Sequence, residues 1–347
     1  MNLQTYTHTN ISDGKSTPDT DILADQFSRT FDYIRIAVNE QCNLRCVYCM
    51  PGNGIHFKSE ENLLSTNEIL RIIDVVSQLG VKKIRLTGGE PLLRKDIIEL
   101  IENANNIQNV ESIHLTTNGL LLEKNASRLK NAGLRGINIS LDTLNDQKYV
   151  KITRRNSLAQ VKKGIEKAIQ LGFSSVKINV VAMRGFNDDE IEHFAELSRV
   201  NPITVRFIEL MPFDTHQIWK TGKFYSAEKI TEDLTKQYPA LTPCNGSKTE
   251  HRVFHIPGYC GKIAIIPSYT RDICGTCNRI RLTADGKILN CLYTHKEFDL
   301  RGVIRNGSNN TDIVNLFKQA MWGKMEDGWI AQKMGNDQRE SMTQIGG

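Results

Sequence analysis

The feature that most limits the fold is an alternation of short apolar segments with amphipathic ones between residues 33 and 210. The predicted strands are Tyr33–Val38, Lys83–Thr87, Ser112–Thr117, Gly136–Leu141, Ser175–Val181 and Thr204–Leu210. The predicted helices are Thr66–Leu79, Asp96–Ile107, Glu123–Ala132, Ser157–Leu171 and Asp188–Val200, where apolar residues recur three or four positions apart. This order predicts an α/β fold with a parallel sheet covered by helices. Periodicity alone leaves a doubly wound sheet and an incomplete barrel equally open.

In both architectures, functional residues gather where the strands end. Several conspicuous residues stand there: Cys42 after the first strand, Gly88-Gly89-Glu90-Pro91 after the second, Asn118-Gly119 after the third, Asp142 after the fourth and Met211-Pro212 after the sixth. We therefore expect one site at this edge of the sheet.

Beyond residue 214 the pattern changes, and a second, α+β region is predicted. Its strands are Arg252–Ile256, Lys262–Ile266, and a hairpin of Arg279–Thr283 with Lys287–Asn290 around Asp285-Gly286; its helix is Asp312–Met321. The predicted division is a flexible extension over 1–21, a partial barrel over 22–214 and a C-terminal region over 215–347.

Charge and cysteine usage exclude several classes of protein. A formal charge of +5 over 347 residues, with scattered pairs such as Lys82-Lys83, indicates mostly solvated cations and argues against a nucleic-acid module. No apolar run approaches the ~20 residues that span a bilayer. The polar N-terminus has no signal-peptide pattern, so a cytoplasmic protein with reduced thiols is expected.

The first cysteine group is Cys42-x3-Cys46-x2-Cys49. Clusters of iron and sulfide are usually held by four cysteines, so three leave one iron of a four-iron cube open. The amino and carboxylate groups of S-adenosylmethionine (SAM) can chelate that iron. The alternatives are a zinc site that lacks its fourth ligand and buried structural thiols. The glycines of Gly88-Gly89-Glu90-Pro91 would let a ligand approach the backbone, and the carboxylate of Glu90 could accept an ammonium.

The second group is Cys274-x2-Cys277 followed by Cys291. Spacing alone leaves a zinc site and a second three-thiolate cluster equally open, with Cys244, Cys260 or His295 as a fourth zinc ligand contributed by folding. Arg279 and Arg281 alternate on one strand and face the same way, which suits an anionic ligand such as phosphate; solvated surface arginines are the alternative.

These motifs together closely resemble the MoaA family of GTP 3′,8-cyclases, radical SAM enzymes of molybdenum cofactor synthesis, over about residues 22–347. The resemblance rests on Arg35-Ile36 leading to Cys42–Pro51, and on Ile84–Pro91, Thr116–Gly119, Ser140–Asp142, Lys151–Arg155, Lys177–Asn179, Glu209–Pro212, the second cysteine group and the terminal Gly346-Gly347.

The resemblance implies an incomplete (β/α)6 barrel of TIM type with a C-terminal cluster region. It implies two [4Fe-4S] clusters, one on Cys42, Cys46 and Cys49 and one on Cys274, Cys277 and Cys291. It places SAM on Tyr48, Gly89, Ser140 and Met211, and GTP on Arg35, Arg85, Thr116, Lys177, Arg279, Ile280 and Arg281. It gives catalytic roles to Arg279, Arg281, Gly346 and Gly347. From the residues alone, Tyr48 and Met211 fit core packing equally well, and Gly346-Gly347 fits a frayed terminus.

The implied reaction begins with a 5′-deoxyadenosyl radical that takes the hydrogen from C3′ of GTP. The C3′ radical then attacks C8 of guanine, and reduction gives the 3′,8-cyclised nucleotide. The implied partners are GTP, a reducing electron donor and cyclic pyranopterin monophosphate synthase, which would receive the product. A homodimer is compatible with the resemblance; nucleic acid and membrane are not expected as partners. The nearest rival is a radical SAM maturase with an auxiliary cluster that acts on a peptide.

Overall fold

A computed structural model describes residues 22–211, 222–246, 252–270, 273–334, 339 and 341–346. The six predicted strands are confirmed, with no end displaced by more than one residue. They are β1 (Tyr33–Ala37), β2 (Lys83–Thr87), β3 (Ser112–Thr117), β4 (Gly136–Ser140), β5 (Ser175–Ala182) and β6 (Thr204–Glu209). The predicted extension over 1–21 and the boundary at 214 lie outside the described residues.

All five predicted helices are present: α1 (Thr66–Gln78), α2 (Ile97–Asn105), α3 (Leu122–Asn131), α5 (Leu158–Gln170) and α6 (Ile191–Val200). Four α-helices of the described residues were not predicted: α4 (Asp146–Thr153), α7 (Ala227–Gln237), α8 (Leu300–Arg305) and α10 (Gly328–Lys333). α4 has only eight residues and ends on Arg154 in a left-handed conformation (φ 59°), so it lacks the glycine that usually marks a helix end.

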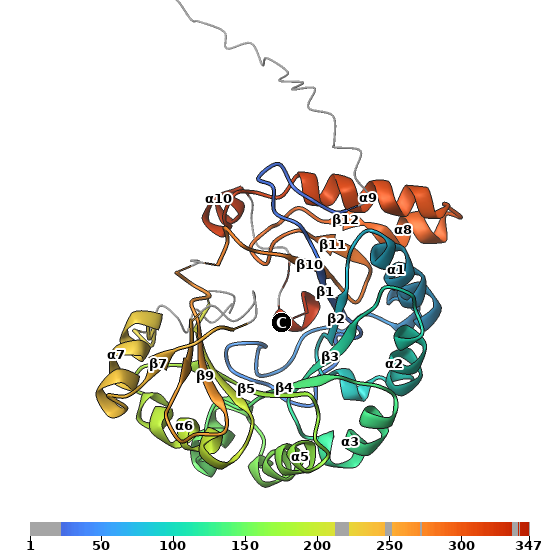
Figure 1. The fold of residues 1–347 in the computed structure, drawn as a ribbon. Coiled ribbons are helices and arrows are strands. Elements are labelled where there is room, and N and C mark those ends of the chain that lie inside the picture. Colours follow the sequence, from blue (N-terminus) through green and yellow to red (C-terminus); the bar gives the residue numbers. More distant parts are fainter. Residues whose placement is uncertain are drawn as a thin grey trace, which may run out of the picture.

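Strand order decides between the two architectures. β1 to β6 lie side by side in chain order and pair in parallel, without the reversal of order that defines a doubly wound sheet. β1 and β6 do not pair with each other, so these strands form an open, incomplete barrel with the helices outside (Figure 1). The predicted fold class is confirmed.

The C-terminal region extends both edges of this sheet. β9 (Lys262–Ile266) pairs in parallel with β6, and β10 (Arg279–Leu282) pairs in parallel with β1. The predicted hairpin is β10 with β11 (Lys287–Leu289). The remaining elements are β7 (Thr242–Pro243), β8 (Arg252–His255), β12 (Phe298–Asp299), α8 (Leu300–Arg305), α9 (Asn310–Trp322) and α10 (Gly328–Lys333).

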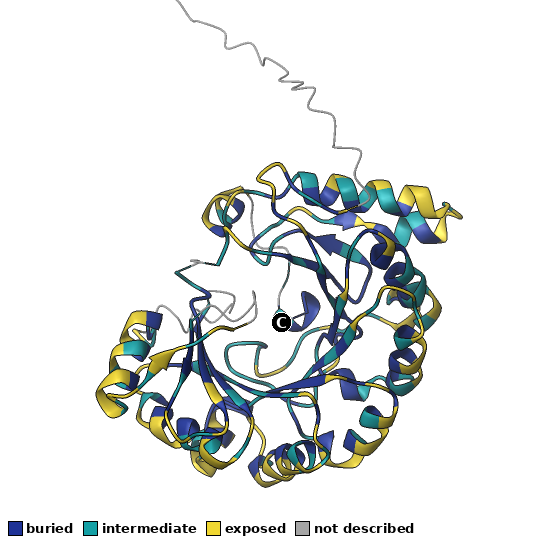
Figure 2. Cartoon of the chain, viewed as in Figure 1, coloured by how far each residue is buried: buried dark blue, intermediate teal, exposed yellow. Residues whose placement is uncertain are grey.

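The hydrophobic core lies between the sheet and the helices, where each helix buries its apolar face and exposes the opposite one (Figure 2). Along β3, the buried residues Ile113 and Leu115 alternate with His114 and Thr116. Since successive side chains of a strand face opposite sides, the polar residues point into the barrel. The polar interior is thus a direct consequence of the period-two pattern. Within the described ranges, no helix is long and apolar enough to cross a membrane.

Candidate active site

The first cysteine group forms a loop directly after β1, fastened to the end of α4. Its thiols belong to Cys42, Cys46 and Cys49, all reduced and partly buried. The amides of Arg45 and Val47 donate to the carbonyl oxygens of Thr153 and Ile152 at 3.1 and 2.9 Å. Burial, together with the charge of Cys42, raises the pKa of Cys49 to about 12. Three enclosed thiolates would repel one another, so this donor set suits a strongly cationic centre such as iron.

The second group is assembled by the β10–β11 hairpin, which lies between Cys277 and Cys291 in the chain. Burial alone would raise the pKa of Cys277, but the positive charges of Lys324 and Arg279 lower it below its ordinary value. Lys324 is itself buried and donates to the carbonyl oxygen of Asn290, next to Cys291. This set also fits a cationic cluster, with a lysine beside it.

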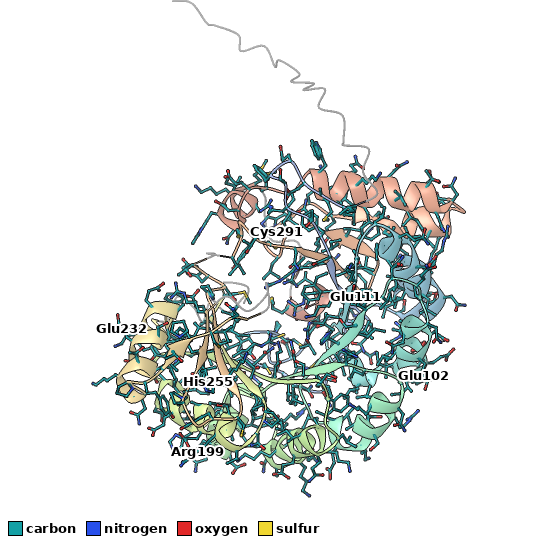
Figure 3. All side chains as sticks on the ribbon, viewed as in Figure 1. Glu102, Glu111, Arg199, Glu232, His255 and Cys291 are labelled. Carbon is teal, nitrogen blue, oxygen red and sulfur yellow. The ribbon has the colours of Figure 1, made fainter. Side chains whose placement is uncertain are left out.

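Both cysteine groups line one cavity of about 320 Å³. Figure 3 shows Cys291 within the ring of strands and helices, whereas Glu102 and Glu232 lie on helices at its periphery. In the part of the chain that the structure describes, no three His, Cys, Asp or Glu side chains converge as they would around a single metal ion. Cys244 and Cys260 do not line the cavity, nor does His295, so the structure does not bring the suggested fourth zinc ligands to it.

Arginines form one wall of the cavity. Arg35 stands between Arg85 and Arg281, which are its partners in the register of β2 and β10, and Arg279 lies two residues before Arg281. All four line the cavity together with Thr116. Among the described residues, no carboxylate pairs with Arg85 or Arg281. Arg85 donates to the hydroxyls of Tyr33 and Thr116, and Arg281 donates to a main-chain carbonyl. Adjacent buried guanidinium groups are costly without an anion, so the wall suits an anionic ligand.

The sequence analysis missed two further cations on this inner face. It grouped Lys83 with Lys82 as solvated, yet only Lys82 is exposed, in an ion pair with Glu111 at 2.8 Å. Lys83 lies over the ring of Tyr33, 5.3 Å from its centroid. Arg206 lines the cavity from β6 and donates to Asn179 at 2.8 Å. The alternation of side chains along a strand could have placed Lys83 on the inner face, because it precedes Arg85 by two residues on the same strand.

This concentration of positive charge changes the ionisation of its neighbours. Burial would raise the pKa of Tyr33, but Arg85 and the other cations around it lower that pKa to about 7. Lys177 does not line the cavity; it lies on the inner face of β5, two residues before Asn179, which does. Burial, and then the charges of Arg206 and other cations, lower the pKa of Lys177 to about 6. A nearby polyanion would reverse both effects.

The Gly-Gly turn lines the cavity, as a ligand contact would require, and it also packs against the first cysteine loop. A Cβ on Gly89 would stand 2.1 Å from the carbonyl oxygen of Gln41, and one on Gly88 2.3 Å from that of Asn39. The glycines therefore let β2 pack directly on the loop that leads to Cys42. Glu90 is fully buried and accepts from Thr117 Oγ1 at 2.7 Å and from Leu92 N at 3.0 Å. Because these donors already occupy its carboxylate, the expected contact between Glu90 and an ammonium is not supported.

The four residues expected to contact SAM all line the cavity: Tyr48, Gly89, Ser140 and Met211. The hydroxyl of Tyr48 donates to Asp142 Oδ2 at 2.7 Å, and Asp142 Oδ1 accepts from the amide of Val181 at 2.8 Å. Asp142, a residue that the sequence analysis only noted, thus fixes the position of the Tyr48 ring. Tyr48 lies at the cavity rather than wholly within the core.

Ile280 lies in the core, whereas Gly346 lies inside the barrel. The Ile280 side chain is fully buried in the core on the opposite face of β10, so only its main chain can face a ligand. The carbonyl oxygen of Gly346 accepts from Arg281 at 2.7 Å inside the barrel. The turn that precedes it lies at the centre of the ring (Figure 1). This favours a threaded tail over a frayed one; Gly347 lies outside the described residues.

Two family models match the chain. Residues 36–198 match the radical SAM superfamily, and residues 203–329 match the family described as Molybdenum Cofactor Synthesis C. SuiB from Streptococcus suis, in a crystal structure bound to SAM, is 15% identical with a TM-score of 0.58 over 86% of this chain and 72% of that one. At that identity, the likeness shows the fold alone.

Closer relatives cover nearly the whole chain. A GTP 3′,8-cyclase of Chlorobaculum tepidum is 42% identical over 94% of this chain and 97% of its own. The mitochondrial GTP 3′,8-cyclase of Arabidopsis thaliana is 42% identical over 88% of this chain and 79% of its own. The molybdenum cofactor biosynthesis protein 1 of Drosophila melanogaster is 43% identical over 87% of this chain and 54% of its own. This chain therefore belongs to the GTP 3′,8-cyclase family of the radical SAM superfamily.

Proposed function

We propose that the cavity converts GTP to (8S)-3′,8-cyclo-7,8-dihydroguanosine 5′-triphosphate, the first step of molybdenum cofactor biosynthesis. The observation that carries the proposal is the joint placement of two three-thiol groups and an arginine wall around one cavity. One three-thiol group suits the cluster that cleaves SAM, the second suits a cluster that holds the base, and the arginines suit a triphosphate. The buried arginines favour this substrate over a peptide.

In this proposal, Cys42, Cys46 and Cys49 hold the [4Fe-4S] cluster that binds SAM, and Cys274, Cys277 and Cys291 hold a second [4Fe-4S] cluster that binds the guanine edge. When bound, the first cluster would supply the electron that cleaves SAM, and the resulting 5′-deoxyadenosyl radical would take the C3′ hydrogen of GTP. After the C3′–C8 bond forms, a second electron from the reductant and a proton would complete the cyclised nucleotide. The protein positions the reacting atoms and encloses them, which directs a reactive radical to one carbon. Tyr48, oriented by Asp142, and Gly89, Ser140 and Met211 hold SAM.

The arginine wall holds the triphosphate. A triphosphate carries about four negative charges, and guanidinium forks bind phosphate oxygens in pairs. The proposed GTP contacts are Arg35, Arg85, Thr116, Lys177, Arg279, Arg281 and the main chain of Ile280. Lys83 and Arg206 join this set because they share the inner face. Arg279 and Arg281 orient the substrate, and Gly346 and Gly347 close the site from the tail side.

The proposal also includes a cytoplasmic location, a one-electron reductant and transfer of the product to cyclic pyranopterin monophosphate synthase. The division into residues 22–214 and 215–347, and a homodimer, remain parts of the same proposal. Each can be tested on its own without affecting the assignment of the cavity.

The decisive experiment is anaerobic. The protein is reconstituted with iron and sulfide, and 5′-deoxyadenosine and cyclised guanine are quantified with GTP, ATP or no nucleotide. We expect release of 5′-deoxyadenosine that depends on GTP, together with formation of the cyclised product. Cleavage of SAM that ignores GTP would refute the substrate assignment and leave a peptide-modifying maturase as the better candidate. Arg85→Met should abolish the dependence of SAM cleavage on GTP. Lys82→Met should keep it, because Lys82 is exposed just before the same strand.

A further inference from the structure

The C-terminal tail, residues 341–346, contacts both the first cysteine loop and the arginine wall. Ser341 Oγ donates to the carbonyl oxygen of Cys49 at 2.8 Å, and the amide of Met342 reaches the same oxygen at 3.4 Å. Thr343 and Ile345 are buried, and Gly346 meets Arg281 at the arginine wall. The segment therefore lies between the first cysteine loop and the proposed triphosphate site.

The last turn spans only Met342–Gln344, and short 3₁₀ turns contribute little stability of their own. Ordering a terminal segment costs conformational entropy, and terminal residues fray unless another contact fastens them. An anchor shortly before Ser341 would add to the burial of Thr343 and Ile345 in keeping the turn in place.

Arg339 provides such an anchor. Its Nε lies 2.7 Å from Glu297 Oε1, and its Nη1 lies 3.3 Å from Asp285 Oδ1. The side chains of Arg339 and Asp285 are only 14% and 7% exposed, so solvent screens this pair far less than a surface pair. Glu297 and Asp285 together raise the pKa of Arg339 despite its burial, which keeps the guanidinium charged.

The anchor is connected to the first cysteine loop as well. Lys58 Nζ lies 2.6 Å from Asp285 Oδ2 and 3.4 Å from Glu40 Oε1, and Glu40 precedes Cys42 by two residues. Charges of alternating sign thus run from Glu40 through Lys58 and Asp285 to Arg339 and Glu297. This ionic latch, defined by those five residues, joins the first cysteine loop, the β10–β11 turn and the tail.

We propose that Arg339 is a positioning residue whose ion pairs with Asp285 and Glu297 hold the tail in the cavity. This inference rests on the proposed role of the tail in the cyclisation. Arg339 acts through Ser341–Gly346 and touches neither SAM nor GTP. Losing its charge should free the tail without altering the cavity that the strands build.

The test replaces Arg339 in the full-length reconstituted protein. Arg339→Gln removes charge-assisted hydrogen bonds, so the seated fraction of the tail relative to the free fraction should fall by roughly 10- to 100-fold. Hydrogen exchange of the amides over residues 341–346 should accelerate by a similar factor, while exchange over β1–β6 stays unchanged. The control is Arg305→Gln, which removes an equally short 2.7 Å pair with Glu68, a residue of α1 that belongs neither to the tail nor to the five residues of the latch. That control should leave exchange of the tail amides unchanged.

Activity supplies a second readout. In Arg339→Gln, kcat for cyclisation should fall while KM for SAM stays unchanged. A synthetic peptide of residues 339–347 should restore turnover, because its own arginine can occupy the vacated site between Asp285 and Glu297. The same peptide with glutamine in place of that arginine should restore much less. A merely structural role would not produce this dependence on the arginine of the added peptide.

Unchanged tail exchange in Arg339→Gln, or equal restoration by the two peptides, would overturn the proposal. If Arg339→Gln does not fold, Glu297→Gln keeps the Asp285 pair and should show the same changes at smaller amplitude. If the unaltered protein shows no GTP-dependent 5′-deoxyadenosine, the proposed function fails. The exchange comparison still decides whether Arg339 holds the tail.

Discussion

The contact between the Gly-Gly turn and the first cysteine loop leads to a quantitative prediction for Gly89→Ala. The added Cβ would lie 2.1 Å from the carbonyl oxygen of Gln41, and real Cβ contacts essentially never fall below 3.0 Å. The loop must therefore retreat by about 0.9 Å or more. That movement would stretch the hydrogen bond from Glu90 N to Gln41 O, now 2.7 Å, and the one from Gly89 N to Asn39 O, now 3.0 Å, past their useful range.

Losing two buried backbone hydrogen bonds should lower the free energy of unfolding by roughly 2–4 kcal/mol. Because the loop continues directly into Cys42, the displacement should also impair iron binding at the first site and spare the second. Urea denaturation measures the first effect. Iron and sulfide analysis with electron paramagnetic resonance measures the second, and the iron content should fall from about eight to about four per chain.

The matched control is Gly323→Ala, because a Cβ there would meet its nearest neighbours at ordinary distances of 3.5 and 3.8 Å. It should keep both the iron content and the unfolding midpoint. If Gly89→Ala unfolds at the same urea concentration and binds the full complement of iron, the inferred close packing of the turn on the loop is wrong.

Other predictions concern charge and metal. With its pKa lowered to about 6, Lys177 is mostly neutral at pH 8; a bound triphosphate should recharge it, so GTP binding should take up about one proton there. Calorimetry in two buffers of different ionisation enthalpy measures the total proton uptake. Tyr33, whose pKa is lowered to about 7, should contribute to it as well, so Lys177→Met should reduce the uptake by about one proton; equal uptake in both proteins would contradict the assignment. The same shift predicts that stability without ligand rises with pH between about 6 and 10.5, because the unfolded chain binds the extra proton. Cys277→Ala should lose the second cluster and keep the first, and zinc in the unaltered protein would refute that cluster. Arg281→Met should weaken GTP binding and also accelerate hydrogen exchange of the Gly346 amide, because Arg281 is proposed to bind the triphosphate and donates to the Gly346 carbonyl. Unchanged hydrogen exchange would contradict the contact of Arg281 with the tail.

Local pattern explains why so much of the barrel could be predicted. β2 and β3 begin and end at the predicted residues, because the spacing of apolar and polar side chains along the sequence differs between strands and helices. The two cysteine groups were recognised for a similar reason, since the spacing of both and the position of the first after a predicted strand are properties of the sequence. Short α4 was missed because its eight residues carry too few apolar positions to show a period.

The sequence by itself determined the alternation of strands and helices, the two cysteine groups and, through family resemblance, the expected chemistry. Only the tertiary structure decided how the parts meet. The register of the sheet placed Arg35 between Arg281 and Arg85, although some 200 residues of chain separate Arg281 from β2. Folding showed that the Gly-Gly turn serves loop packing, that Lys83 faces inward, and that Arg339 joins the tail to the turn at Asp285. The physical reason is that burial and pairing depend on distances between residues remote in sequence, which local periodicity does not contain.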